Sequence, residues 1–172
     1  MTKDLTAGQD YSPAGNELTG DISIRAMEKE DSPMVRLLFE KCFSHPWSLQ
    51  SIEDMSNHSG YLNLLAWQGQ RLIGYAGILS AADEADITNV ATDPDYRRRS
   101  VAHHLLQELL GKAHKKGIGA IYLEVRQSNQ PAIKLYEKAG FIQEGVRKNY
   151  YQDPREDAVI MKASLENRQM IE

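Results

Sequence analysis

The segment from residue 85 to residue 117 changes its hydrophobic period from two to about 3.6 within a few residues. Residues 85–92, with the sequence ADITNVAT, fit a half-buried strand. Residues 101–117 follow three arginines and repeat apolar side chains every three or four positions, and two lysines before Gly117 are typical of a helix end. The expected apolar stripe contains Val101, Leu105, Leu109 and Ala113, with Leu106 and Leu110 beside it. The segment therefore predicts a strand that turns directly into a long amphipathic helix.

The same two periods alternate along most of the remaining chain. Strands are expected at residues 22–27, 61–67, 71–79, 85–92, 120–126, 141–151 and 157–163. Shorter helices are expected at residues 29–43, 48–55 and 131–140. In the first of these helices, the expected apolar positions are Met34, Leu37, Leu38 and Phe39. Strands followed by helices and then by further strands favour an α/β domain in which helices cover a mixed sheet.

Length and charge exclude several classes of protein. The 172 residues fit one domain, residues 21–172, after a leader of residues 1–20 whose Gly, Ser, Pro and polar content predicts flexibility. The N-terminus lacks the apolar run of a secretory signal, and no run of about 18 apolar residues predicts a membrane span. A net charge of −4 argues against direct nucleic-acid binding. Because the lone Cys42 cannot form an internal disulfide, we expect a cytoplasmic protein, and we expect a monomer.

Three consecutive arginines, Arg97 to Arg99, stand directly before the long helix. The unpaired N–H groups of a helix N-terminus favour an anion such as a phosphate, and arginine adds planar donors for phosphate oxygens. The small residues Ser100 and Ala102 would let the backbone approach such a group. No glycine precedes Gly111 here, so neither the dinucleotide-binding nor the P-loop motif is present. From this loop alone, a pyrophosphate site and a solvated surface patch remain equal alternatives.

Four segments carry a resemblance to a known family. The segment VATDPDYRRRSVAHHLL resembles motif A of the GCN5-related N-acetyltransferases (GNAT), Gln/Arg-x-x-Gly-x-Gly/Ala, with Arg97, Ser100 and Ala102 at its defined positions. The segments LEVRQSNQPAIKLYEKAGF, RKNYYQDPREDAVIM and HPWS resemble the bacterial type that acetylates the terminal alanine of a ribosomal protein, the RimI type. The resemblance spans about residues 22–162. It implies the GNAT fold, a mostly antiparallel sheet of six to seven strands with helices on both faces.

The resemblance also implies acetyl-coenzyme A as co-substrate and no metal. It places the pantetheine arm along a strand that bulges and splays from its neighbour, and it places the pyrophosphate at the helix N-terminus. The implied coenzyme-binding residues are Val90, Ala91, Thr92, Arg97, Arg98, Arg99, Ser100, Val101, Ala102, His103 and Asn129. Asn129 is equally a candidate helix N-cap, and both roles are compatible. Ser100 replaces the usual motif glycine, so its Cβ would crowd the phosphate or its hydroxyl would donate to it.

Two residues are implied to carry the chemistry, with Glu124 as the general base and Tyr136 as the proton donor to the departing thiolate. Without the resemblance, Glu124 would be an ion-paired residue on a polar strand face and Tyr136 a core residue. Glu84 and Asp86 are weaker candidates for the base. Cys42 is not expected to carry the acetyl group, because direct attack by the amine needs no covalent step.

The acceptor side is implied to contain an aromatic slot of Trp47, Tyr150 and Tyr151, although these residues equally fit domain packing. Acidic candidates for contacting a basic peptide are Glu40, Asp54 and Asp153. At pH 7 an α-amine costs about 1.4 kcal/mol to neutralise and a lysine about 4.6 kcal/mol, which favours an N-terminal acceptor. The expected function is therefore acetyl transfer to a protein N-terminus, of a ribosomal protein by resemblance. Lysine or small-molecule acetylation and a non-catalytic acyl-coenzyme A sensor remain alternatives.

Overall fold

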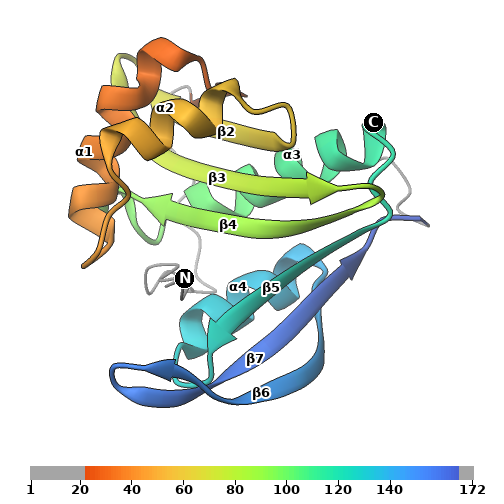
Figure 1. The fold of residues 1–172 in the computed structure, drawn as a ribbon. Coiled ribbons are helices and arrows are strands. Elements are labelled where there is room, and N and C mark those ends of the chain that lie inside the picture. Colours follow the sequence, from red (N-terminus) through yellow and green to blue (C-terminus); the bar gives the residue numbers. More distant parts are fainter. Residues whose placement is uncertain (1–21, 167–172) are drawn as a thin grey trace.

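The structure is a computed structural model that describes residues 22–166, in which seven strands form one sheet in the order β1-β2-β3-β4-β5-β7-β6 (Figure 1). The strands are β1 Ile22–Ala26, β2 Tyr61–Gln68, β3 Arg71–Ala81, β4 Glu84–Thr92, β5 Ala120–Arg126, β6 Ile142–Gln152 and β7 Arg155–Ser164. Every neighbouring pair is antiparallel except β4 with β5. The expected mixed, mostly antiparallel sheet is confirmed. The leader expected at residues 1–20 lies outside the described residues.

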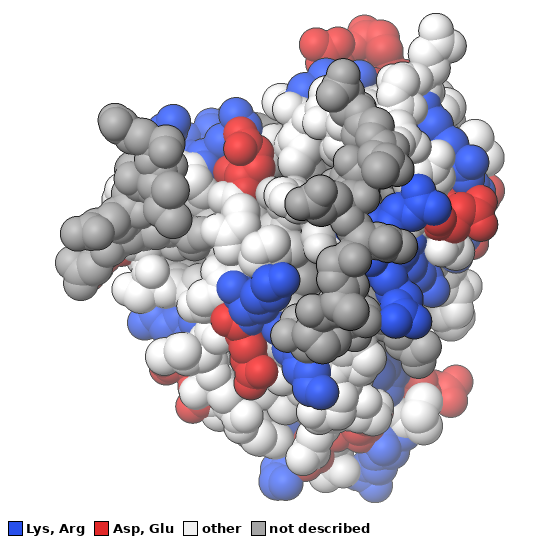
Figure 2. Space-filling view, turned by 180° about the vertical axis from the view of Figure 1, so that it is seen from behind, with Lys and Arg blue, Asp and Glu red and all other residues white. Residues whose placement is uncertain are grey.

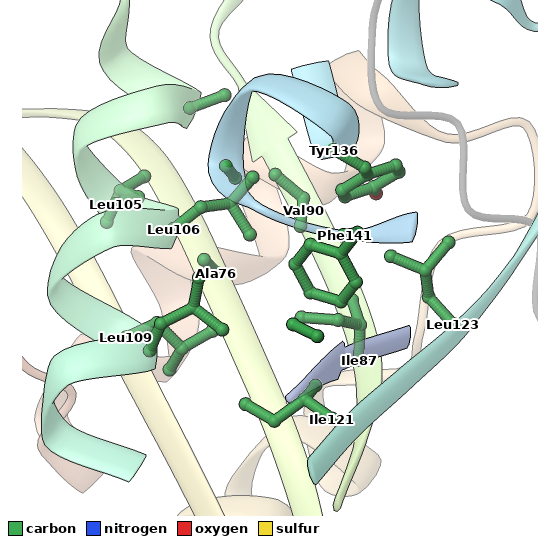
Figure 3. Close-up of a cluster of buried hydrophobic side chains, with 14 of the residues drawn as sticks. Ala76, Ile87, Val90, Leu105, Leu106, Leu109, Ile121, Leu123, Tyr136 and Phe141 are labelled. Atoms are coloured by element: carbon green, nitrogen blue, oxygen red, sulfur yellow. The ribbon is translucent and has the colours of Figure 1, made fainter. Parts of the chain in front are cut away.

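Helices cover both faces of the sheet, as expected. They are α1 Ser32–Cys42, α2 Leu49–Asn57, α3 Val101–Lys115 and α4 Gln130–Ala139, with 3-10 turns η1 Lys29–Asp31 and η2 Pro94–Tyr96. The larger core lies between the sheet and the helices α3 and α4, and Figure 3 shows leucines of α3 with side chains of β4 and β5 in this layer. The whole expected stripe of α3 is buried there, which confirms its helical period.

The opposite face carries α1 and α2, which pack on β2 and β3 (Figure 1). Here the expected face of α1 was partly wrong, because Val35, Leu38 and Phe39 are buried while Met34 and Leu37 are exposed. The Phe39 ring stands edge-on to Tyr75 of β3, with ring centroids 4.9 Å apart. That aromatic contact fixes the rotation of the helix, which the apolar spacing of the sequence alone left ambiguous.

Charges of both signs are interspersed on the face seen in Figure 2. Within residues 22–166, no helix combines the length and the apolar character that crossing a membrane requires. Over the same residues, no three His, Cys, Asp or Glu side chains gather in an arrangement that would hold a metal ion.

Candidate active site

The sheet opens between β4 and β5, the two strands that α3 connects. They pair at only three positions, Glu84 with Ala120, Ala85 with Ile121 and Asp86 with Tyr122. Beyond this point the strands diverge, which leaves the β5-facing edge of residues 87–92 without a strand partner (Figure 1). The expected splay is therefore present. Val90, Ala91 and Thr92 all lie along the open part of β4.

A β-bulge lies where the opening begins. In the pairing of β3 with β4, Gly77 is opposite Asn89 and Ile78 is opposite Ile87, so Thr88 is the extra residue. A bulge bends its strand and redirects the neighbouring side chains. Thr88 and Asn89 are both buried, and within residues 22–166 the Asn89 Oδ1 has no hydrogen-bond partner. The open edge therefore begins with two buried polar side chains, and no described residue uses the acceptor of Asn89.

The loop between β4 and α3 adopts a conformation rich in left-handed residues. Arg98 has φ +63° and Ser100 has φ +60°, both unusual for residues other than glycine. Successive residues of alternating handedness form a concavity of backbone N–H groups that suits an anion. Ser100 is the N-cap residue of α3, but its side chain makes no cap hydrogen bond. The first-turn N–H groups of Val101, Ala102 and His103 follow directly, and no helix carbonyl precedes them to accept.

The three arginines do not share one environment. Arg97 is half-buried and lies near Cys42, on the side of α1. Arg98 and Arg99 are exposed, and the Arg99 guanidinium stacks over the Tyr96 ring at 5.1 Å. The structure therefore directs Arg97 away from solvent and leaves two exposed arginines beside the helix N-terminus.

Asp93 anchors the same loop to the body of the domain. Its carboxylate is 3% exposed and accepts from Lys41 Nζ at 3.0 Å, from Arg71 at 3.1 Å and from the N–H of Asp95 at 3.1 Å. Burial alone would raise the pKa of Asp93, but the hydrogen bonds from Lys41, the Asp95 N–H and Arg71 together lower it. The end of β4 is thereby held to α1 and β3 through a charged carboxylate.

Two more of the residues expected to bind the coenzyme, His103 and Asn129, lie at the beginnings of α3 and α4. His103 is half-buried, and burial, with smaller effects of Lys138 and His104, lowers its pKa, so the imidazole is neutral at neutral pH. Asn129 is the N-cap of α4, and its Oδ1 accepts from the N–H of Ala132 at 3.3 Å. The expected capping role of Asn129 is confirmed.

Glu124 lies on the β5 face that is turned away from α3 and α4, because the alternate residues Leu123 and Val125 are buried in the core on the other side. Its side chain is 18% exposed, and Oε1 lies 3.4 Å from Nε of Arg147 on β6. The expected ion pair of this polar strand face therefore exists. It does not exclude a role as base, since the Arg147 side chain is 56% exposed and such pairs are weak in water.

Tyr136 of α4 is fully buried and packs against Phe141, with ring centroids 5.7 Å apart (Figure 3). Its hydroxyl has no hydrogen-bond partner in the described residues. Burial, with a smaller effect of Tyr151, raises the pKa of Tyr136 well above its ordinary value. A buried tyrosine normally finds a partner for its hydroxyl, so this one is a donor that no residue between 22 and 166 uses.

A pocket of about 260 Å³ lies on the α1 side of the opening. Its walls come from the loop after α1, the bulge of β4, the end of β5 and the β6–β7 hairpin. They comprise Phe43, Ser44, His45, Trp47, Thr88, Asn89, Arg126, Tyr151, Gln152 and Asp153. Trp47 and Tyr151 thus share this pocket as expected, whereas Tyr150 does not line it.

Tyr150 instead lies near Glu124, the candidate base. Burial and the nearby Glu124 carboxylate raise the pKa of Tyr150, against a smaller opposing effect of Arg147. The ring of the neighbouring Tyr151 lies under the Arg126 guanidinium at 4.1 Å, and its centroid is 5.1 Å from that of Tyr150. The aromatic slot expected from the sequence is therefore divided between the pocket and the surroundings of Glu124.

The weaker candidates lie away from the opening or are already engaged. Glu84 and Asp86 lie on the part of β4 that still pairs with β5, and Glu84 accepts from the Tyr122 hydroxyl at 3.2 Å. Glu40 pairs with Arg36 at 2.8 Å, and Asp54 accepts from Gln50 at 2.8 Å, whereas Asp153 lines the pocket. Burial raises the pKa of Cys42 to about 11, so its thiol is protonated at neutral pH and a poor nucleophile.

Sequence reasoning missed three polar residues of this region, Asn89, Arg126 and Arg147. Arg126 donates to the carbonyls of Asp153 and Pro154 and so holds the β6–β7 hairpin against β5. Arg147 pairs with Glu124 across two strands that are not sheet neighbours. Only Asn89 had a local signal, a carboxamide within the apolar run of a strand that is followed by the arginine loop.

Comparison with known proteins agrees with this geometry. The sequence profile of the acetyltransferase (GNAT) family matches residues 32–141. The chain is 36% identical over 141 residues to the [ribosomal protein bS18]-alanine N-acetyltransferase of Escherichia coli K12, covering 81% of this chain and 95% of that protein.

Solved structures extend the likeness. The crystal structure of the ribosomal-protein-S18-alanine N-acetyltransferase from Escherichia coli superposes with a TM-score of 0.78 at 34% identity, covering 87% of this chain and all of that one. The PaiA N-acetyltransferase from Thermoplasma acidophilum, solved in complex with coenzyme A, shares the fold with a TM-score of 0.71 at 22% identity, covering 84% of this chain and 99% of that one. On the strength of the profile and the Escherichia coli relative, this chain belongs to the acetyltransferase (GNAT) family.

Proposed function

We propose that this protein transfers the acetyl group of acetyl-coenzyme A to the N-terminal alanine of a ribosomal protein. The observation that carries the proposal is the opening between β4 and β5. It has the Glu124 carboxylate on one side and, on the other, the buried Tyr136 hydroxyl, which pairs with no residue in the range 22–166. The choice of a ribosomal alanine rests on the name of the Escherichia coli relative, which this chain matches over 95% of that protein's length.

The open edge of β4 and the first turn of α3 fit the two polar parts of the coenzyme. Backbone groups of Val90, Ala91 and Thr92 would pair with the amides of the pantetheine arm, completing the ladder that β5 leaves. The N–H groups of Ser100 to His103 would hold the pyrophosphate, with the exposed Arg98 and Arg99 beside it. Bound in this way, acetyl-coenzyme A supplies the activated acetyl group.

Glu124 then removes a proton from the acceptor α-amine, directly or through one water. The neutral nitrogen attacks the thioester carbon and becomes positively charged. As the carbon–sulfur bond breaks, the nitrogen loses its second proton to water, and the sulfur leaves as a thiolate that takes up one proton to become the free thiol of coenzyme A. An amine with a pKa near 8 is already about one-tenth neutral at pH 7, so a weakly basic carboxylate suffices.

Tyr136 acts on the leaving sulfur. Because burial disfavours its phenolate, Tyr136 is a weaker acid than tyrosine in water and stays protonated at neutral pH. Complete proton transfer to a thiolate, whose conjugate acid has a pKa near 8.5, is therefore uphill. Its main contribution is a hydrogen bond that strengthens as negative charge develops on sulfur, and the proton that the attacking nitrogen releases replaces any proton that Tyr136 passes to the sulfur.

The proposal extends to the compartment, the oligomeric state and the binding partners of the protein. We infer a cytoplasmic monomer whose partner is a protein N-terminus and which binds neither nucleic acid nor membrane directly. The acidic net charge and the interspersed surface charges in Figure 2 support the absence of nucleic-acid binding.

A thiol-release assay with three short peptides tests the proposal. One peptide begins with a free alanine, the second has the same sequence with a blocked terminus, and the third has a blocked terminus and an internal lysine. We expect release only with the free alanine. Release with the lysine peptide would move the protein to lysine acetylation, whereas coenzyme binding without release from any acceptor would identify an acyl-coenzyme A sensor.

A further inference from the structure

Asn89 is a buried carboxamide with an unused acceptor. The residue is 5% exposed, and its Oδ1 has no hydrogen-bond partner in the described part of the chain. Asn63 on β2 is similarly buried at 7% exposure, but its Oδ1 accepts from the Tyr75 hydroxyl at 2.8 Å. Because an unpaired buried acceptor costs folding free energy, native proteins rarely retain one without a partner from outside the chain.

The position of Asn89 suggests what that partner is. Asn89 directly follows the bulge at Thr88 and lines the pocket on the α1 side, together with Trp47 and residues of the β6–β7 hairpin. Asn89 directly precedes Val90, where the open edge of β4 continues toward α3. The pocket therefore reaches the strand edge that the acetyl-bearing arm is proposed to follow.

The missing partner of the Asn89 Oδ1 must be a hydrogen-bond donor, and the arginine in the pocket wall is already engaged. The guanidinium of Arg126 already donates to the carbonyls of Asp153 and Pro154 and to Glu156. A free carbonyl oxygen on Asn89 can only accept. The proposed acceptor molecule brings an α-amine, which is a donor through its N–H bonds.

We propose that Asn89 binds the acceptor α-amine, with its Oδ1 accepting one N–H so that the nitrogen lone pair is directed at the thioester. This inference rests on the proposed function and adds a substrate-binding residue to it. A neutral carboxamide suits the task, because a carboxylate at the same position would favour the protonated ammonium, which has no lone pair to attack with.

Two substitutions and one matched control test this assignment with alanine-initiated peptide as acceptor. Asn89→Leu removes the acceptor at similar volume and should raise the peptide KM about tenfold, the value of one hydrogen bond, while the coenzyme Kd stays within twofold. Asn63→Leu removes an equally buried carboxamide outside the pocket. It should lower the melting temperature and leave the peptide KM within twofold.

Asn89→Asp gives a readout that a structural role would not produce. The new carboxylate should raise the pKa of the bound amine, so the acidic limb of the kcat profile should move to higher pH by about one unit. An active parent enzyme with an unchanged peptide KM in Asn89→Leu and an unmoved limb in Asn89→Asp would overturn the role of Asn89 alone. A parent enzyme that acetylates no α-amine would overturn the proposed function and this inference together.

Discussion

The two sides of the opening between β4 and β5 are built from different kinds of groups. On the α3 side, most of the candidate binding groups are backbone amides of the β4 edge and of the helix N-terminus, held in place by loop conformation, beside the side chains of Arg98, Arg99 and Tyr136. On the α1 side, they are side chains, namely Glu124, Asn89, Trp47 and Tyr151. A backbone site tolerates changes of residue type, whereas a side-chain site does not. This difference explains how serine can occupy position 100 of the motif.

The largest change in activity is expected from a substitution on the α1 side of the opening, where side chains form the candidate site. Glu124→Gln removes the proposed base and should lower kcat with the alanine peptide by about 10²-fold or more. The coenzyme Kd, measured by calorimetry, should stay within twofold because the backbone site is intact. Glu84→Gln is the matched control, since Glu84 lies where β4 and β5 still pair, and it should leave kcat within twofold. A normal kcat in Glu124→Gln would remove Glu124 from the mechanism.

Tyr136→Phe should separate catalysis from stability. Loss of a hydrogen bond to a developing thiolate should lower kcat by about 10- to 100-fold. Because the buried hydroxyl has no partner within the described residues, its removal should also raise stability by about 1 kcal/mol, a gain of about 2–4 °C in melting temperature. Steady-state kinetics and thermal unfolding measure the two effects. A loss of stability would show that the hydroxyl has a structural partner.

Asp93→Asn tests the backbone half without touching its N–H groups. Loss of the charge that holds Lys41 and Arg71 should lower stability by about 1–3 kcal/mol and weaken coenzyme binding about tenfold. Asp31→Asn is the control, because Asp31 is a similarly shielded carboxylate paired with Arg25 in a different part of the chain. That variant should lose stability and keep its coenzyme affinity. Equal coenzyme affinities in both variants would show that the loop does not need its anchor.

The same carboxylates predict how stability depends on pH. The pKa of Asp93 and that of Asp31 are both lowered in the folded protein. A lowered pKa contributes stability that is complete above the unfolded value near 3.9 and is lost as the pH falls through the folded value. Denaturant unfolding should therefore show stability falling below about pH 4, less steeply in Asp93→Asn. Identical slopes in the variant and the parent would contradict the lowered pKa of Asp93.

The smallest effect is expected for Ser100→Gly. Relief of a left-handed residue should raise stability by at most about 1 kcal/mol, while the coenzyme Kd stays within twofold because every backbone donor remains. Ala82→Gly is the control, since Ala82 has φ +57° in the turn before β4, at the opposite end of that strand from the arginine loop. A coenzyme affinity that rises severalfold only in Ser100→Gly would show that the serine side chain obstructs the phosphate.

The same contrast separates what was predictable from sequence from what was not. The strands, the α3 stripe and the cap of α4 follow from local spacing and were predicted correctly. The buried face of α1 depends on the contact of Phe39 with Tyr75, more than thirty residues away, and was partly wrong. The unpaired Asn89 and the pair of Arg147 with Glu124 depend on a bulge and on strands brought together by the fold. Such tertiary contacts leave no periodic signal in the chain.

Only three residue pairs join β4 to β5, so within the described residues few backbone hydrogen bonds hold the two halves of the sheet together there. A molecule that forms hydrogen bonds along the open edge would link those halves. Because it would bind only the folded protein, its binding would raise the free energy of unfolding. At a concentration one hundred times its Kd, this linkage amounts to about 2.7 kcal/mol. The resistance of the protein to heat and to proteases would then depend on how much of it carries coenzyme.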